Sequence, residues 1–314
     1  RRSLIVLTAA TRSSRSLRLP LAVPLLFSVL FAMEHPQDVA VPVPYVSRLS
    51  QKLQPGQTLV IHGDTIKDAK RFEVNLLSGS AEIGASSQVI LHVSVRFDEG
   101  KIVLNSLDLG TWGKEERVSN PFKAGQDFDL RIRAHDDKFE ISANHKEIRE
   151  YKYRFPLNAV EYFVVRGDVK LKGVHWGGRY YTLPFETQFN DGHLASGQRV
   201  YVYGIPKGER FNVDFVARNG DILFHFNPRF KEKKVVRNAE IAGSWGTEER
   251  EGPFPFKKDI SFDLVFLNEP YSIQIFHDGE RIGTFAHRTK DPRNDYMGLR
   301  IAGDLELTGL EFSH

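Results

Sequence analysis

The chain of 314 residues contains no cysteine, two methionines and three tryptophans. The lack of cysteine excludes disulfide bonds, thiolate metal ligands and cysteine nucleophiles. The sequence also lacks an Asn-x-Ser/Thr acceptor, a His-x-x-x-His pair, a Gly-rich phosphate loop and a Gly-x-Ser-x-Gly nucleophile motif. We therefore predict no metal and no cofactor.

Excess charge of one sign is also missing from most of the chain. The net charge of +3 depends on five arginines within residues 1–32, a stretch without acidic residues. Without those five, 38 basic residues face 40 acidic ones, which gives a net charge of −2. A slightly acidic body has no electrostatic footprint for nucleic acid, so we expect no such partner.

Long hydrophobic runs are absent, apart from one N-terminal stretch. The apolar run 19–32 follows the arginine-dotted residues 1–18, and Pro20 and Pro24 interrupt it. It is too short to span a bilayer, so we expect no integral membrane span. Two interpretations stay open: a cleaved leader, or upstream sequence that does not belong to the natural protein. In both, the mature chain starts near Met33, and residues 1–40 lie outside the fold.

The strongest internal feature of the sequence is a repeat. Residues 92–117 and 225–250 align without a gap, at a constant offset of 133 positions. A repeat that preserved only a fold would keep apolar positions, whereas here polar residues recur and indicate two copies of a site. The recurring residues are His92 with His225, Arg96 with Arg229, Asn105 with Asn238, Trp112 with Trp245, Glu115 with Glu248 and Arg117 with Arg250.

The flanks of this segment repeat as well, at slightly larger offsets. Residues 70–75 correspond to 209–214, and residues 53–57 correspond to 194–198. The repeat therefore predicts two domains, 41–177 and 181–314, joined by the linker 178–180. A connection this short cannot act as a flexible tether, so we expect the domains to keep a preferred mutual orientation.

Both domains are predicted to be β structure. Segments rich in β-branched and aromatic residues, such as 200–203 and 262–266, alternate with turn pairs such as Asn219-Gly220 and Asp278-Gly279. No stretch shows sustained helical periodicity with caps. The fold class is therefore all-β, with two antiparallel β-sandwich domains in tandem.

One strand-like segment of the second copy carries a row of polar groups. His225, Asn227 and Arg229 occupy alternate positions, so their side chains project from one face. Phe224 and Phe226 then fall on the opposite face and can join the core. Imidazole, amide and guanidinium groups in a row can satisfy several sugar hydroxyls at fixed angles.

A second polar cluster follows downstream, with Asn238, Trp245, Glu248 and Arg250. An indole offers a flat apolar surface on which the apolar face of a galactose ring can lie. Glu248 can accept from hydroxyls, while Arg229 and Arg250 hold it and lower its pKa.

The run HFNPR, followed by V-x-N and WGxEER, resembles the carbohydrate-recognition motif of galectins. The chain after about residue 41 resembles a tandem-repeat galectin of the nematode type. The resemblance implies jelly-roll, concanavalin-like sandwiches that bind β-galactosides such as lactose and N-acetyllactosamine on glycoproteins and glycolipids, without catalysis. It also implies a cytosolic and extracellular location through non-classical secretion, which conflicts with a signal peptide in 1–32 unless Met33 is the true start.

The resemblance also assigns roles to matching positions. In the second copy these are His225, Asn227 and Arg229 at the axial 4-hydroxyl, Asn238 and Glu248 at the 6-hydroxyl, Trp245 by stacking, and Arg250 in support. In the first copy the matching residues are His92, Ser94, Arg96, Asn105, Trp112, Glu115 and Arg117.

Two departures from the family pattern affect the expected specificity. Ser94 and Val95 replace the asparagine and proline of the motif, and one hydroxyl offers less than an amide. A missing hydrogen bond costs roughly 0.5–3 kcal/mol, so we expect weaker or different galactoside binding at the first site. Residues 230–237 are also shorter than in many vertebrate galectins and lack a histidine often found there, which leaves the preference for extended glycans open.

Two other functions compete with a lectin. A glycosidase could use neighbouring carboxylates such as Glu248 and Glu249, or Glu115 and Glu116, but hydrolysis needs two carboxyls at one bond, one of them protonated. Adjacent strand residues face opposite sides, and neighbouring arginines favour the ionised form, so we predict no enzyme. The third possibility is a protein-interaction module that has kept the sandwich but lost sugar binding, above all in the first copy.

Overall fold

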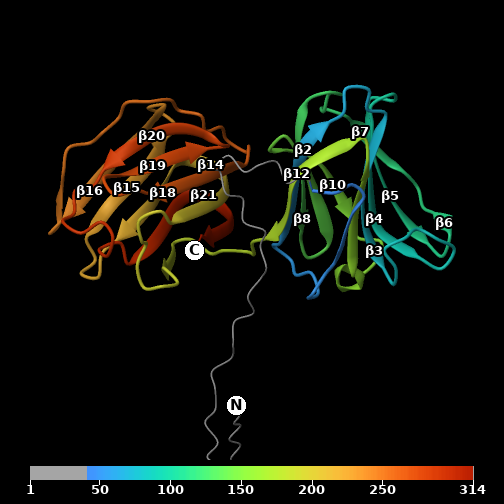
Figure 1. The fold of residues 1–314 in the computed structure, drawn as a ribbon, viewed down its shortest axis with the longest axis horizontal. Coiled ribbons are helices and arrows are strands. Elements are labelled where there is room, and N and C mark those ends of the chain that lie inside the picture. The colour runs from blue at the N-terminus through green and yellow to red at the C-terminus, as the bar shows by residue number, and fades with distance from the viewer. Residues whose placement is uncertain (1–40, 314) are drawn as a thin grey trace, which may run out of the picture.

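The computed structural model describes residues 41–313, so the predictions for residues 1–40 lie outside the described part. Its regular structure is almost entirely antiparallel β-sheet, which confirms the predicted all-β fold class (Figure 1). A single 3-10 turn, η1 (Leu157–Ala159), interrupts the strands of this part. No helix among the described residues is long and apolar enough to cross a membrane.

The first domain is a sandwich of a seven-stranded and a five-stranded sheet. The larger sheet has the order β1-β11-β3-β4-β5-β6, with β7 also paired to β5, and the smaller has the order β10-β9-β8-β2-β12. The strands are β1 (Tyr45–Arg48), β2 (Thr58–Thr65), β3 (Arg71–Ser78), β4 (Gln88–Arg96), β5 (Lys101–Asp108), β6 (Thr111–Trp112), β7 (Glu116–Ser119), β8 (Asp127–Ala134), β9 (Lys138–Ala143), β10 (Lys146–Lys152), β11 (Tyr162–Gly167) and β12 (Val169–Gly177).

The second domain contains the same two layers, but two long strands run through both of them. β14 pairs with β21 along most of its length, and a register break between Pro206 and Phe211 interrupts this pairing. The first part of β14 also pairs with β18, and its last part with β15. The strands are β13 (Phe185–Gln188), β14 (Arg199–Val216), β15 (Ile222–Arg229), β16 (Lys234–Ile241), β17 (Ser244–Trp245), β18 (Phe262–Asn268), β19 (Ser272–His277), β20 (Glu280–Ala286) and β21 (Gly298–Phe312).

Each sandwich is held together by apolar side chains between its two layers. Strands alternate inward and outward residues, and the inward set of each domain forms its own core cluster. In the second domain the core is rich in phenylalanine; Phe211, Phe215 and Phe266 are fully buried. Phe224 and Phe226 lie in this core, as predicted from their alternation with the polar row.

The two domains also contact each other. Arg131 on β8 of the first domain forms an ion pair with Asp263 on β18 of the second, with Nη1 and Oδ1 2.8 Å apart. A short β-bridge joins Lys146 to Ile260. Both contacts involve the layer that does not carry the repeated polar residues. Figure 1 shows β8 and β12 on the side of the first domain that faces the second, and β5 and β6 on its far side.

Candidate functional site

A histidine and a tryptophan lie together at the centre of each repeated polar set. His92 on β4 and Trp112 on β6 have ring centroids 4.8 Å apart, and His225 on β15 and Trp245 on β17 have centroids 4.9 Å apart. The tryptophans are 44% and 49% exposed, which is unusual for such large apolar residues. An exposed indole beside a row of polar groups provides a stacking surface with hydrogen-bonding groups at its edge.

The polar row of the second domain is held by hydrogen bonds within the protein. Arg229 donates from Nε to Oδ1 of Asn227 at 2.7 Å and from Nη2 to Glu248 at 2.9 Å. Arg250 donates to the other Glu248 oxygen at 2.7 Å. The hydrogen bond from Arg250, and then that from Arg229, hold the pKa of Glu248 below its usual value, as predicted. Glu248 is therefore an ionised acceptor at neutral pH.

The first domain repeats this arrangement, with longer contacts from Arg96 to Glu115 and Ser94 and a shorter one, of 3.0 Å, from Arg96 to Glu99. Arg96 donates to Glu115 at 3.4 Å, and Arg117 donates to the same carboxylate at 2.8 Å. The Arg117 hydrogen bond lowers the pKa of Glu115. Arg96 reaches Ser94 at 3.3 Å, beyond the usual N–H···O range. The serine therefore holds its arginine less firmly than the asparagine of the second domain does.

A buried residue on the neighbouring strand orients each histidine, and sequence reasoning did not identify it. Asn75 and Asp214, both almost fully buried, lie 2.5 Å from Nδ1 of His92 and His225. The Asp214 carboxylate can only accept, so Nδ1 of His225 carries a proton and Nε2 is left as an acceptor. Asn75 and Asp214 occupy matching positions in the flanking repeat, and this match was the available signal.

Burial also affects the first histidine. His92 is 7% exposed, and desolvation lowers its pKa to about 4. Its imidazole is therefore neutral at physiological pH and can accept one hydrogen bond while it donates another.

A second pair of supporting residues was also missed. Arg154 and Arg288 donate to the side-chain oxygens of Asn105 and Asn238, at 3.0 and 2.8 Å. The two asparagines in turn donate to the backbone carbonyls of Gly113 and Gly246, at 2.9 Å in both domains. This network fixes each asparagine beside its tryptophan-bearing strand. The two arginines lie 134 positions apart, so extending the repeat beyond residue 117 would have found them.

Glu99 and Glu232 form the third missed pair. Arg117 donates to Glu99 at 2.7 Å, and Arg250 is hydrogen-bonded to Glu232. Both glutamates lie inside the gap-free repeat at the same offset of 133. Each site therefore contains a ladder of alternating carboxylates and guanidinium groups that fixes the arginine facing the pocket.

The predicted residues divide into pocket-lining and supporting groups. The supporting residues contact lining residues: Ser94 and Asn227 accept from the lining arginines, and Arg117 and Arg250 donate to the lining glutamates. The pocket of the first domain is lined by the predicted His92, Arg96, Asn105, Trp112 and Glu115, and that of the second by His225, Arg229, Asn238, Trp245 and Glu248.

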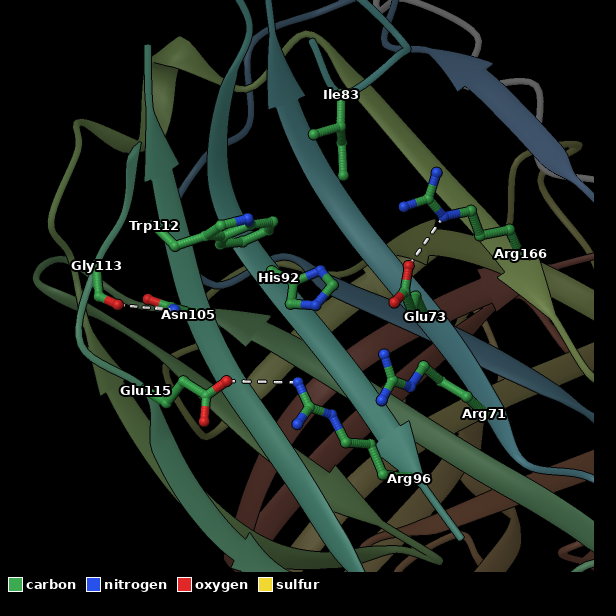
Figure 2. Close-up of a pocket in the computed structure, with 10 residues that line it drawn as sticks. All are labelled: Arg71, Glu73, Ile83, His92, Arg96, Asn105, Trp112, Gly113, Glu115 and Arg166. Atoms are coloured by element: carbon green, nitrogen blue, oxygen red, sulfur yellow. Dashed lines mark hydrogen bonds and ion pairs between the residues drawn. The ribbon is translucent and has the colours of Figure 1, made fainter. Parts of the chain in front are cut away.

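The first pocket is larger, at about 390 Å³ against about 290 Å³. Its additional lining comes from β3, β11 and the loop after β3, through Arg71, Glu73, Ile83 and Arg166. Figure 2 shows the two arginines across the pocket from Trp112, with Arg166 joined to Glu73 at 2.9 Å. These charged groups extend the first site beyond the repeated motif.

Within residues 41–313, possible metal ligands gather at a different place. Atoms of His145, Asp263 and Asp278 lie within 4.8 Å of one another at the contact between the domains. Arg131 already donates to both oxygens of Asp263. This cluster belongs to the domain contact and to neither pocket.

The comparison with known proteins agrees with this geometry. A family model described as galactoside-binding lectin matches residues 44–176 and again residues 184–312. The chain belongs to the galactoside-binding lectin family. The predicted resemblance to galectins is therefore confirmed, and membership of a family of non-catalytic lectins makes this chain a binding protein.

Relatives of this lectin match it over most of their own length. It is 53% identical over 272 residues to a 32 kDa beta-galactoside-binding lectin of Caenorhabditis elegans, with 86% of this chain and 96% of that protein covered. The identity to the Haemonchus contortus 32 kDa beta-galactoside-binding lectin is 51%, covering 86% and 95%. Human galectin-4 is 30% identical, covering 85% and 94%. A crystal structure of the Caenorhabditis elegans galectin LEC-6 covers 43% of this lectin and 94% of its own chain, with 27% identity and a TM-score of 0.40.

The carboxylates considered for a glycosidase point to different partners. Glu248 is held by Arg229 and Arg250, whereas Glu249 pairs with Arg288 at 2.9 Å. Since hydrogen bonds from its arginines lower the pKa of Glu248, this carboxylate is not set up as a protonated acid.

Proposed function

We propose that this lectin binds β-galactosides of the lactose and N-acetyllactosamine type reversibly at both pockets. One observation carries the proposal: in each domain a half-exposed tryptophan lies less than 5 Å from a histidine that has a fixed hydrogen-bond partner. Stacking on the indole and hydrogen bonds to the polar row match a sugar with one apolar face and several directed hydroxyls. The names of the two nematode relatives support this ligand class.

The affinity of each site is expected to be modest. A disaccharide has few atoms, so we expect dissociation constants of roughly 10–200 µM per site. Two sites on one chain then gain strength by simultaneous binding, and the lectin cross-links glycoproteins or glycolipids. We further propose that it acts both in the cytosol and outside the cell, which it reaches by non-classical secretion.

Calorimetric titration of lactose into the full chain tests this function. The wild type should bind lactose saturably at two sites per chain. Trp245→Ala should lose the site of the second domain, and Trp112→Ala should lose the site of the first. Cellobiose, whose 4-hydroxyl is equatorial, serves as the control sugar and should give no heat. Lack of lactose binding in a folded wild type would reject the proposal.

A protein-interaction module is the alternative. Competition with lactose distinguishes the two functions. Millimolar lactose displaces a partner that is bound at the sugar sites, and it does not displace a partner that is bound at another surface. Intact lactose after long incubation would further distinguish binding from hydrolysis.

A further inference from the structure

Two arginines on the outer face of the first domain are unexpectedly buried. On β8, Leu130 and Ile132 point into the core, so Arg131 and Arg133 point away from it. Outward positions of an antiparallel sheet ordinarily face water. Arg131 and Arg133 are nevertheless only 6% and 3% exposed. The second domain therefore covers the outer face of the five-stranded sheet.

Arg131 joins the domains with well-defined geometry. Its Nη1 and Nη2 donate to the two oxygens of Asp263 at 2.8 and 2.9 Å. Its Nε and Nη2 donate to the two oxygens of Asp129, on the same strand, at 2.7 and 2.9 Å. A planar guanidinium held between two carboxylates resists rotation more than a single lysine contact would.

Other contacts surround this ion pair. Ser261 of the second domain donates its backbone N–H to the carbonyl of His145 at 2.9 Å, and His175 lies 2.6 Å from Glu311. The linker is packed too, because a Cβ on Gly178, whose φ is +84°, would lie 2.0 Å from the Thr308 carbonyl oxygen. The linker and both domain faces thus resist a hinge movement.

The covered face determines where the sugar sites point. In each sandwich the polar row projects outward from one layer, since its neighbours Leu91 and Val93, or Phe224 and Phe226, fill the core. The domain contact uses the outward face of the other layer: β8 and β12 in the first domain, and β18 with the C-terminal part of β21 in the second. The two site-bearing layers are therefore the outermost layers of a four-layer stack.

We infer that this lectin is a rigid back-to-back pair whose two sugar sites face opposite directions, so that it bridges galactosides on two separate surfaces and does not bind two glycans on one flat surface. The inference rests on the proposed function. The ion pair between Arg131 and Asp263 holds the two domains in this arrangement.

Bilayers that display lactosylceramide test this geometry with the full chain. Wild type should aggregate phosphatidylcholine vesicles containing the glycolipid, and Trp245→Ala should not. On a supported planar bilayer of the same composition, both proteins should bind, and tenfold more glycolipid should change the apparent Kd of either by less than about twofold. Two sites on the same side would instead gain about 100-fold or more from simultaneous binding.

The outcomes separate the two proposals. A density-dependent gain on the planar bilayer in wild type, absent from Trp245→Ala, would overturn the opposed orientation. No binding to any lactosylceramide bilayer would reject the sugar-binding function itself.

A second variant tests the role of this ion pair. Asp263→Arg places two guanidinium groups against each other across the domain contact, while Arg131 keeps its bonds to Asp129. It should increase the radius of gyration in solution scattering and introduce density dependence on the planar bilayer. The control, Asp137→Arg, makes the same charge change at an exposed carboxylate of the first domain and should change neither. Unchanged scattering and binding in Asp263→Arg would contradict the role of the Arg131–Asp263 pair in holding the domains together.

Discussion

The difference between Asn227 and Ser94 allows a reciprocal test of how each site holds its arginine. Asn227 accepts from Arg229 Nε at 2.7 Å, while Ser94 lies 3.3 Å from Arg96 Nε. We expect Asn227→Ser to weaken lactose binding at the second site. Ser94→Asn should strengthen binding at the first site.

The structure sets the size of the effect. A hydrogen bond to a charged group contributes about 1.5–3 kcal/mol when fully formed. Arg229 keeps its bond to Glu248 and is partly exposed, so about 1 kcal/mol of positioning should be lost. This corresponds to roughly a fivefold change in Kd.

The same substitution has a separate effect on stability. Asn227 also donates from Nδ2 to the buried carbonyl of Phe211 at 2.7 Å. A serine would leave this carbonyl without that donor, which should lower the free energy of unfolding of the second domain by about 1–3 kcal/mol. Affinity and stability are therefore two independent readouts of one residue.

The assay is lactose calorimetry in a background in which a tryptophan substitution inactivates the site that is not under test. Asn227→Ser is measured in a Trp112→Ala background, and Ser94→Asn in a Trp245→Ala background, with Ser94→Ala as control. Thermal unfolding of each variant reports stability. If Asn227→Ser loses stability as expected while its lactose Kd stays within about twofold, Asn227 does not act on the sugar site through Arg229.

Three further predictions concern other residues of the sites. Arg288→Ala should raise the lactose Kd of the second site roughly threefold to tenfold, because Asn238 loses the arginine that donates to it at 2.8 Å. Arg281 is an exposed arginine of the same domain, so Arg281→Ala is the calorimetric control and should leave the Kd unchanged. His92 has a pKa of about 4 in the folded state and 6.5 in the unfolded state. Its contribution to the free energy of unfolding is therefore complete above pH 6.5, and up to about 3 kcal/mol of it is lost as the pH falls toward 4. Urea unfolding at pH 7 and pH 4.5 should show this loss in wild type and a smaller one in His92→Gln; equal losses would refute the assignment. Because His92 stays neutral and Glu115 stays ionised, the lactose Kd of the first site in Trp245→Ala should change less than about twofold between pH 7.5 and 5.5, and a steeper calorimetric profile would point to another titrating group.

The repeat made most of the fold and site predictable from the sequence. A constant offset between His92 and His225 identifies equivalent positions without any structure. Strand alternation then places the polar row on one face and Phe224 and Phe226 in the core, because successive side chains point to opposite sides. Local rules sufficed here, since these residues are close in sequence and belong to one or two adjoining strands.

Residues that act from other strands were not predictable in this way. Asn75 and Asp214 reach the histidines because β3 and the last part of β14 pair with the histidine-bearing strands, and that pairing is a tertiary fact. Arg154 reaches Asn105 from 49 positions away. Their roles depend on sheet order and side-chain reach, which no local pattern specifies.

The relative orientation of the domains was decided only by the tertiary structure. The sequence determined by itself that there are two copies, that each is a β-sandwich, and that the linker is short. A short linker limits the separation of the domains but leaves many orientations open. Arg131 and Asp263 lie 132 positions apart in different domains, and only their meeting across the domain contact selects the back-to-back arrangement. Alternation along β8 predicts an outward Arg131, and only the packing of the second domain buries it.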